Sequence, residues 1–316
     1  MSQRTILTIT LNPAVDIATE VDEVIADSKL RCGPPQFDPG GGGVNVARAV
    51  GKLGGTACAL IALAGATGDM LASMLETDGV DMRRIPVDGQ TRQSFTARET
   101  STGRLYRFVT PGPPWRDEDT TTLNRMLAET LDQDAFVVIS GSFPPGADHK
   151  LVPQIVETVG ARGGHVVVDT SGPVLHALAG EPTGLHTLRM DREEAIATSG
   201  RALDTGADFA DFGQTLIAAG VAENVVMGMG PRGSVGVSAG ARFMTARPVL
   251  DPISAVGAGD SFVAAMTLAM ARGADLEAAL AQGTAAAASA VMTPGTALCD
   301  ADQTARFLAE VTTTAL

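Results

Sequence analysis

The most constraining feature of this chain is a regular alternation of helix-like and strand-like segments that starts near residue 117. Segments 117–131 and 150–161 carry apolar residues at helical spacing, and 135–139 is a short apolar run between them. Strands that alternate with helices form parallel pairs joined by right-handed crossovers. The pattern predicts an α/β fold with a doubly wound, mostly parallel sheet flanked by helices. The series continues with expected helices 173–179, 192–199 and 206–220 and expected strands 165–169, 186–190 and 224–229.

The N-terminal part of the chain contributes to the same expected sheet. Thr5–Leu11 has the apolar, β-branched composition of a buried strand, and Ala57–Ala64 is an apolar, strand-like run. Because no shift in composition marks a boundary, we expect a single domain over residues 1–316. Its remaining elements are expected helices at 46–53 and 69–77, an antiparallel edge hairpin at 233–237 and 242–246, and two final Ala-rich helices at 258–271 and 276–292.

Two stretches fall outside this rhythm, at about 17–38 and 92–110. Both alternate polar and apolar residues, and the second is broken by the turn signal Ser101-Thr102-Gly103. We therefore expect exposed strands that lie outside the main sheet. These strands concentrate positive charge in a chain whose net charge is −13, which predicts a local site for an anion. The cluster consists of Lys29, Arg31, Arg92, Arg98, Arg104 and Arg107.

A run of four glycines, Gly40–Gly43, precedes the helix expected at 46–53. Consecutive glycines stabilise neither a strand nor a helix interior, but they let a ligand touch the main chain. Asn45 would then face that ligand from the first helical turn. A flexible linker is the alternative, and the apolar helix that follows at once argues against it.

A second small-residue loop, Gly257-Ala258-Gly259-Asp260, precedes the apolar helical run 262–271. Amide N–H groups at the start of a helix, together with its dipole, bind anions. Asp260 is either a simple N-cap or a carboxylate that activates a group reacting with the bound anion. As an N-cap Asp260 would have only a structural role, whereas as an activating carboxylate it would take part in a reaction.

The expected sheet favours the chemical reading of Asp260. Ligands of doubly wound sheets bind outside the carboxyl ends of the strands. Asp16, Ser140 and Asp169 all follow expected strands, so they should meet the glycine loops there. In such a crevice Asp16 and Asn45 suit sugar hydroxyls, and the arginines suit a phosphate. The Gly257–Asp260 amides suit a transferring phosphoryl group, and Asp260 could take a hydroxyl proton.

Charge and motif content exclude several classes. With 23 Lys and Arg against 36 Asp and Glu, neither nucleic acid nor an anionic membrane is an expected partner. The cysteines, Cys32, Cys58 and Cys299, lack paired or metal-like spacing, which is typical of a reduced cytoplasmic protein. The chain also lacks a P-loop, a Gly-x-Gly-x-x-Gly after the first strand and a Gly-x-Ser-x-Gly elbow.

From end to end the chain resembles the ribokinase-like (PfkB-type) carbohydrate kinases. Val256–Ser261 is similar to that family's C-terminal signature, and Gly40–Arg48 is similar to its N-terminal one. Gly42 stands where ribokinases and 1-phosphofructokinases usually carry Lys. The resemblance is strongest to the minor bacterial 6-phosphofructokinases of the family, and it rests on Lys29–Cys32, Thr91–Gln93, Tyr106–Phe108 and Ser140–Gly146.

The resemblance implies transfer of the γ-phosphate of ATP to the C1 hydroxyl of fructose 6-phosphate. Asp260 would be the general base, and Gly257, Ala258 and Gly259 would form the anion hole. The resemblance also implies Mg²⁺ as a cofactor and a homodimer formed through a β lid made of the 17–38 and 92–110 strands. The implied substrate-binding residues are Asp16, Lys29, Gly41, Gly42, Asn45, Arg92, Arg107 and Ser140.

The chain departs from the family pattern on the nucleotide side. Where the family usually has Lys-Pro-Asn-x-x-Glu, this chain has Arg189-Met190-Asp191-Arg192-Glu193-Glu194. Gly228 and Ala255 stand where a small polar residue and a Thr are common. We therefore expect altered nucleotide affinity or magnesium dependence. The implied nucleotide-binding residues are Arg189, Asp191, Gly228, Gly230, Gly233 and Gly257, and the implied metal ligands are Glu194 and, through water, Asp169.

Three alternatives stay open at the level of sequence. Tagatose-6-phosphate kinase and 1-phosphofructokinase act on sugars that differ by one hydroxyl or by the carbon that is phosphorylated. A single hydroxyl contact discriminates such substrates, and its geometry is not visible in a sequence. The third alternative is a catalytically weak sugar-phosphate sensor, which would keep the basic cluster while the nucleotide side has diverged.

Overall fold

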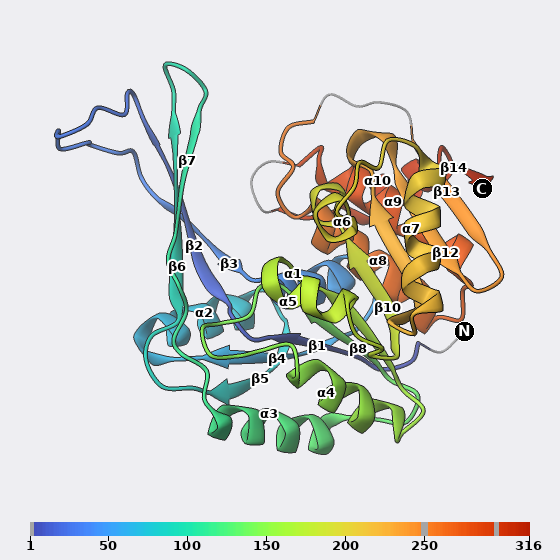
Figure 1. Cartoon of the computed structure of the whole chain (residues 1–316). Coiled ribbons are helices and arrows are strands. Elements are labelled where there is room, and N and C mark those ends of the chain that lie inside the picture. Colours follow the sequence, from blue (N-terminus) through green and yellow to red (C-terminus); the bar gives the residue numbers. More distant parts are fainter. Residues whose placement is uncertain (1–2, 248–251, 294–296) are drawn as a thin grey trace.

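The computed structural model describes residues 3–247, 252–293 and 297–316, and it contains a ten-stranded sheet covered by helices (Figure 1). The strand order is β14-β13-β12-β11-β10-β9-β8-β1-β4-β5, and the seven strands from β11 to β5 run parallel. The predicted doubly wound, mostly parallel sheet is confirmed. Its strands are β1 (Ile6–Thr10), β4 (Cys58–Leu63), β5 (Asp81–Pro86), β8 (Phe136–Ser140), β9 (His165–Asp169), β10 (Leu185–Met190), β11 (Ala222–Gly228), β12 (Ser234–Ser238), β13 (Arg242–Ala246) and β14 (Thr312–Ala315).

Helices cover both faces of the sheet, so its central strands are buried on both sides and consist almost entirely of apolar residues. Helices α1, α2, α8 and α9 pack on one face, and α3, α4, α5 and α7 pack on the other. None of the described helices is long and apolar enough to cross a bilayer. The helices are α1 (Gly42–Lys52), α2 (Gly65–Thr77), α3 (Asp117–Thr130), α4 (Leu151–Gly160), α5 (Gly172–Ala179), α6 (Arg192–Ser199), α7 (Gly206–Ala218), α8 (Ala258–Ala271), α9 (Leu276–Ala290) and α10 (Ala301–Leu308).

A separate four-stranded sheet, here called the lid, projects from the body of the molecule (Figure 1). Its order is β3 (Gln36–Gly40), β2 (Ala14–Val21), β6 (Arg92–Glu99) and β7 (Leu105–Val109). The expected strands outside the main sheet are therefore confirmed. Residues 22–35 form the connection between β2 and β3 rather than strand.

Three elements were not expected from the sequence: β5, α10 and β14. The strand β5 reads Asp-Met-Arg-Arg-Ile-Pro and buries only Ile85, because an edge strand has few neighbours to pack against. The prediction that α9 is the last helix is wrong, since α10 and β14 follow it. Because β14 pairs with β13, the β12–β13 hairpin does not form the edge of the sheet.

The glycine run belongs to regular structure, which corrects the expectation of a loop followed by a helix from residue 46. Gly40 ends β3, while Gly42 and Gly43 form the first turn of α1. A Cβ on Gly43 would lie 2.5 Å from Thr10 Oγ1 and 2.7 Å from the Ile9 carbonyl oxygen. These glycines therefore let the N-terminus of α1 approach the ends of β1 and β8 closely.

This close approach predicts opposite effects for two substitutions within one helix. Gly43→Ala should lower the free energy of unfolding by about 1–3 kcal/mol, because the new methyl group overlaps the backbone of β1. Gly51→Ala in the same helix should raise it by about 0.5–1 kcal/mol, since nothing lies within 4 Å of its added Cβ. Urea unfolding measures both, and equal effects of the two substitutions would contradict this packing.

Candidate functional site

Asp260 lies in the first turn of α8, at the carboxyl edge of the main sheet. Gly257 is the N-cap of this helix, with a left-handed φ of 77° that suits glycine, and Asp260 is the third helical residue. No side chain caps the helix, so the alternative reading of Asp260 as an N-cap is wrong. Its carboxylate is thus available for another task.

The partner of that carboxylate comes from the other glycine-opened helix. Asn45 Nδ2 in α1 donates a hydrogen bond to Asp260 Oδ2 at 2.9 Å. Burial raises the pKa of Asp260 to about 7, and the charge of Asp169 adds to this, while Asn45 and Arg189 act in the opposite direction. A carboxylate with such a pKa is suited to accept a proton near neutral pH.

Asp16 lies at the base of the lid, close enough to Asp260 for its charge to contribute to the raised pKa of Asp260. Its carboxylate lies directly against Gly40, where an added Cβ would be 2.3 Å from Asp16 Oδ2. Burial raises the pKa of Asp16, while Arg92 and Arg107 lower it. The structure thus brings Asp16, Asn45 and Asp260 together with the two predicted arginines.

The basic residues of the lid are not all at the site. Arg92 is partly buried, and its Nε donates to the Asn12 carbonyl oxygen at 3.2 Å, whereas Arg107 is exposed on β7. Lys29 is exposed in the 22–35 connection, which Figure 1 shows at the far end of the lid. Contact between Lys29 and a sugar phosphate stays a prediction.

The other predicted substrate-side residues surround the start of α1. Gly41 is the N-cap of α1 at a φ of 118°, and its added Cβ would lie 2.8 Å from Thr10 Cγ2. An added Cβ on Gly42 would lie 2.3 Å from Ser140 Oγ. A lysine at position 42 would therefore clash with Ser140 in this arrangement. The close approach of Ser140 thus explains why residue 42 is a glycine.

Ser140 and Asp169 end β8 and β9, Arg189 is the penultimate residue of β10, and the three are direct neighbours in register. Arg189 Nη1 and Asp169 Oδ1 form an ion pair at 2.9 Å, with side chains that are 15% and 11% exposed. Ser140 Oγ donates to Asp169 Oδ2 at 3.3 Å. This row of polar side chains connects the predicted substrate side of the site with its predicted nucleotide side.

Asp191 and Glu194 form a capping box at the start of α6. Glu194 N donates to Asp191 Oδ1 at 2.8 Å, and Asp191 N donates to Glu194 Oε2 at 2.7 Å. Burial raises the pKa of Glu194 to about 7, with further contributions from Asp191 and Asp169. The sequence prediction assigned neither residue this structural role.

The acidic groups fit magnesium of the kind that arrives with a nucleotide. Among the described residues no three His, Cys, Asp or Glu side chains lie close enough to hold a metal by themselves. Magnesium usually keeps several waters and uses one or two carboxylates plus substrate phosphates. Asp169 and Glu194 are hard oxygen donors, and the charge of Asp169 adds to the raised pKa of Glu194, a repulsion that a divalent cation would relieve.

The predicted nucleotide-side glycines differ in their surroundings. An added Cβ on Gly228 would lie 3.8 Å from Arg189 Nη2, so this position borders the polar row. Gly230 has a φ of 63° and faces open space. A Cβ on Gly233 would come within 1.9 Å of the Thr245 carbonyl oxygen, so packing against β13 already requires glycine there.

Sequence reasoning missed two polar residues at this edge, Asn12 and Ser94. Asn12 Nδ2 donates to Ser142 Oγ at 3.0 Å, and its backbone carbonyl accepts from Arg92. Ser94 lies beside Asp16 in the parallel β2–β6 pair. The Asn-Pro step after the first strand was a usable signal for Asn12, whereas the register of Ser94 was not visible in the sequence.

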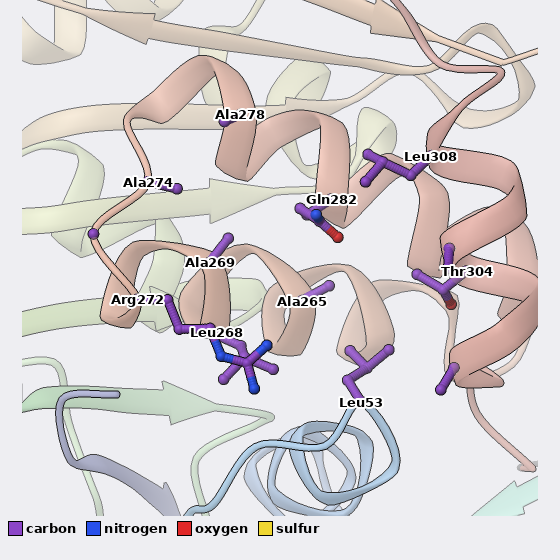
Figure 2. Close-up of a pocket in the computed structure, with 13 residues that line it drawn as sticks. Leu53, Ala265, Leu268, Ala269, Arg272, Ala274, Ala278, Gln282, Thr304 and Leu308 are labelled. Atoms are coloured by element: carbon purple, nitrogen blue, oxygen red, sulfur yellow. The ribbon is translucent and has the colours of Figure 1, made fainter. Parts of the chain in front are cut away.

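A groove lies apart from these residues, among the C-terminal helices. It has a volume of about 470 Å³ and is lined largely by small and apolar side chains of α8, α9 and α10. Arg272 lies at one end of it (Figure 2). None of the predicted site residues lines this groove. The groove is therefore separate from the cluster of polar residues around Asp260.

Comparisons with known proteins concern the whole chain. The family model described as "pfkB family carbohydrate kinase" matches residues 9–303. The chain is 38% identical over 302 residues to ATP-dependent 6-phosphofructokinase isozyme 2 of Mycobacterium tuberculosis, which covers 96% of this chain and 88% of that protein. It is 36% identical over 304 residues to the Escherichia coli isozyme 2, covering 96% and 98%.

A solved structure, phosphofructokinase-2 of Escherichia coli in complex with fructose-6-phosphate, matches with a TM-score of 0.89 at 35% identity. The match covers 97% of this chain and 98% of that one. The expected ribokinase-like fold is therefore confirmed. The chain belongs to the pfkB family of carbohydrate kinases.

Proposed function

We propose that this protein is an ATP-dependent 6-phosphofructokinase that phosphorylates the C1 hydroxyl of fructose 6-phosphate. The observation that carries the proposal is the placement of Asp260. Its carboxylate lies in the first turn of α8, is held by Asn45, and has a pKa raised to about 7. The Mycobacterium tuberculosis and Escherichia coli relatives described above are 6-phosphofructokinases by name.

The substrate side binds the sugar phosphate between the lid and the carboxyl edge of the sheet. Asp16 and Asn45 hold sugar hydroxyls, and the backbone at Gly41 and Gly42 lets the sugar approach closely. Arg92 and Arg107 hold the 6-phosphate, because both lie close enough to the site for their charges to lower the pKa of Asp16. Lys29 joins them when the lid closes, and closure excludes water that would otherwise compete as the acceptor.

The chemical step is an in-line displacement. Asp260 takes the proton of the C1 hydroxyl, the hydroxyl oxygen bonds to the γ-phosphorus of ATP, and the bond from that phosphorus to the bridging oxygen breaks to release ADP. The N–H groups of Ala258, Gly259 and Asp260 have no acceptor within α8, so they can stabilise the transferring phosphoryl group.

The nucleotide side holds the remaining charges of ATP. Arg189 faces its phosphates, and Asp191, Gly228, Gly230 and Gly233 border the nucleotide. Glu194 and, through water, Asp169 would hold Mg²⁺, which supplies charge neutralisation on the ATP phosphates when bound.

The activity test measures ADP release from fructose 6-phosphate and Mg-ATP, and a coupled assay detects the ADP. The wild-type chain should turn over, and Asp260→Asn should lose about 10²–10⁴-fold in kcat, because the base is removed while the hydrogen-bonding shape is kept. Calorimetric titration of fructose 6-phosphate into Asp260→Asn should show that binding is retained.

The controls separate the open alternatives. Tagatose 6-phosphate and fructose 1-phosphate, assayed in parallel, should give lower kcat/KM than fructose 6-phosphate. Sugar-phosphate binding without ADP release by the wild-type chain would identify a sensor. No release above the Asp260→Asn level with any of these sugars would refute the kinase proposal.

We further propose that the lid forms a homodimer interface. One row of apolar side chains, Phe37, Ile17, Phe95 and Phe108, runs in register across all four lid strands. Phe37 is 42% exposed and Phe108 is 59% exposed. Alternation along the strands puts this row on the face opposite Asp16. An exposed apolar row of this kind is typical of an association surface.

The dimer proposal predicts that Phe108→Asp halves the mass measured by sedimentation equilibrium, because a charge would be buried at the interface. Leu105→Asp is the matched control: Leu105 is also on β7 and 61% exposed, but it points to the opposite face. Its mass should equal that of the wild type. A wild-type chain that sediments as a monomer at micromolar concentration would contradict the proposal.

A further inference from the structure

A line of three polar side chains crosses the carboxyl edge of an otherwise apolar part of the sheet. Ser140, Asp169 and Arg189 are paired residue by residue across β8, β9 and β10, so all three project from the same face. The preceding residues of β8 and β9 are almost all apolar and buried. Burying charges here is costly, which calls for a reason beyond stability.

Both oxygens of the Asp169 carboxylate are engaged by this line. Oδ1 accepts from Arg189 Nη1 at 2.9 Å, and Oδ2 accepts from Ser140 Oγ at 3.3 Å. Asp169 is thus held by hydrogen bonds from the two neighbouring strands, β8 and β10. A carboxylate fixed at two points gives the guanidinium that it binds a defined orientation.

The same guanidinium also lies against the start of α8. A Cβ built on Gly259 would be 3.2 Å from Arg189 Nη1 and 3.3 Å from Nη2. A Cβ on Gly228 would be 3.8 Å from Nη2. The guanidinium therefore lies close to two glycines, and a larger residue at position 259 would have to displace it.

We propose that Asp169 is a positioning residue that fixes the Arg189 guanidinium beside the N-terminal amides of α8, so that this helix start carries a built-in cation for a nucleotide phosphate. This role rests on the proposed kinase function. It is separate from any contact between Asp169 and magnesium. Asp169 acts through Arg189. Removing the Asp169 carboxylate leaves the Arg189 guanidinium present but no longer holds it in a fixed orientation.

A double-mutant cycle in the full-length protein tests this role, with ADP binding measured by calorimetry in the presence of EDTA, which removes any contribution from metal. Arg189→Met should weaken ADP binding by about tenfold or more, since a charge-assisted contact is lost. Asp169→Asn should weaken it by a smaller factor. In the Arg189→Met background, Asp169→Asn should have no further effect.

Two results would overturn the proposal. One is an equal effect of Asp169→Asn with and without Arg189. The other is an effect of Asp169→Asn that appears only when Mg²⁺ is present, which would make Asp169 a metal ligand and nothing else. A kinase assay adds a second readout, because misplacing Arg189 should raise the KM for ATP more than that for fructose 6-phosphate.

The single variants leave one buried charge unpaired and could fail to fold. A second comparison, in which neither background has an unpaired buried charge, keeps the proposal testable if they do. Gly259→Ala should weaken ADP binding in the wild type by displacing the guanidinium, and should do so far less in the Arg189→Met/Asp169→Asn double variant, which has no buried charge in this pair. Equal losses in both backgrounds would contradict the role of Arg189 and leave the kinase proposal intact.

Discussion

The hydrogen bond between Asn45 and Asp260 is the contact on which the site depends. It joins the first turns of α1 and α8, which are 215 residues apart in the sequence and are brought to the same edge of the sheet. Both helices begin at glycines because other residues would collide with the strand ends or could not adopt the required backbone. The glycines therefore serve the geometry of this pair as much as the approach of a ligand.

Nearby charges of opposite sign set the pKa of Asp260. Asp16, Asp169 and burial all favour the protonated form of Asp260, and Arg189 and Asn45 favour its charged form. The balance leaves the pKa of Asp260 near neutrality in a chain that is acidic overall. The arginines at the site are thus effective because they are local, and the net charge of −13 does not prevent anion binding.

The sequence predicted the parallel sheet and the residues that gather around Asp260, because strand ends, glycine runs and helix starts are local signals. It could not predict that Asp169 pairs with Arg189, since strand register is a property of the whole sheet. It also missed the Asp191–Glu194 capping box, whose pattern was assigned only to nucleotide and metal binding. The edge strands β5 and β14 were missed because β5 buries only Ile85 and β14 buries none of its residues, so neither has a clear apolar pattern.

The central claim is that the protein holds a carboxylate at residue 260 that exchanges a proton near neutral pH. Carbon-13 NMR of protein labelled at aspartate carboxyl groups tests it in the absence of ligands, with the resonance assigned by its loss in Asp260→Asn. Because burial raises the folded-state pKa, the carboxyl should be protonated below and ionised above a midpoint of about 7. A midpoint near 4, the ordinary value for aspartate, would contradict the account.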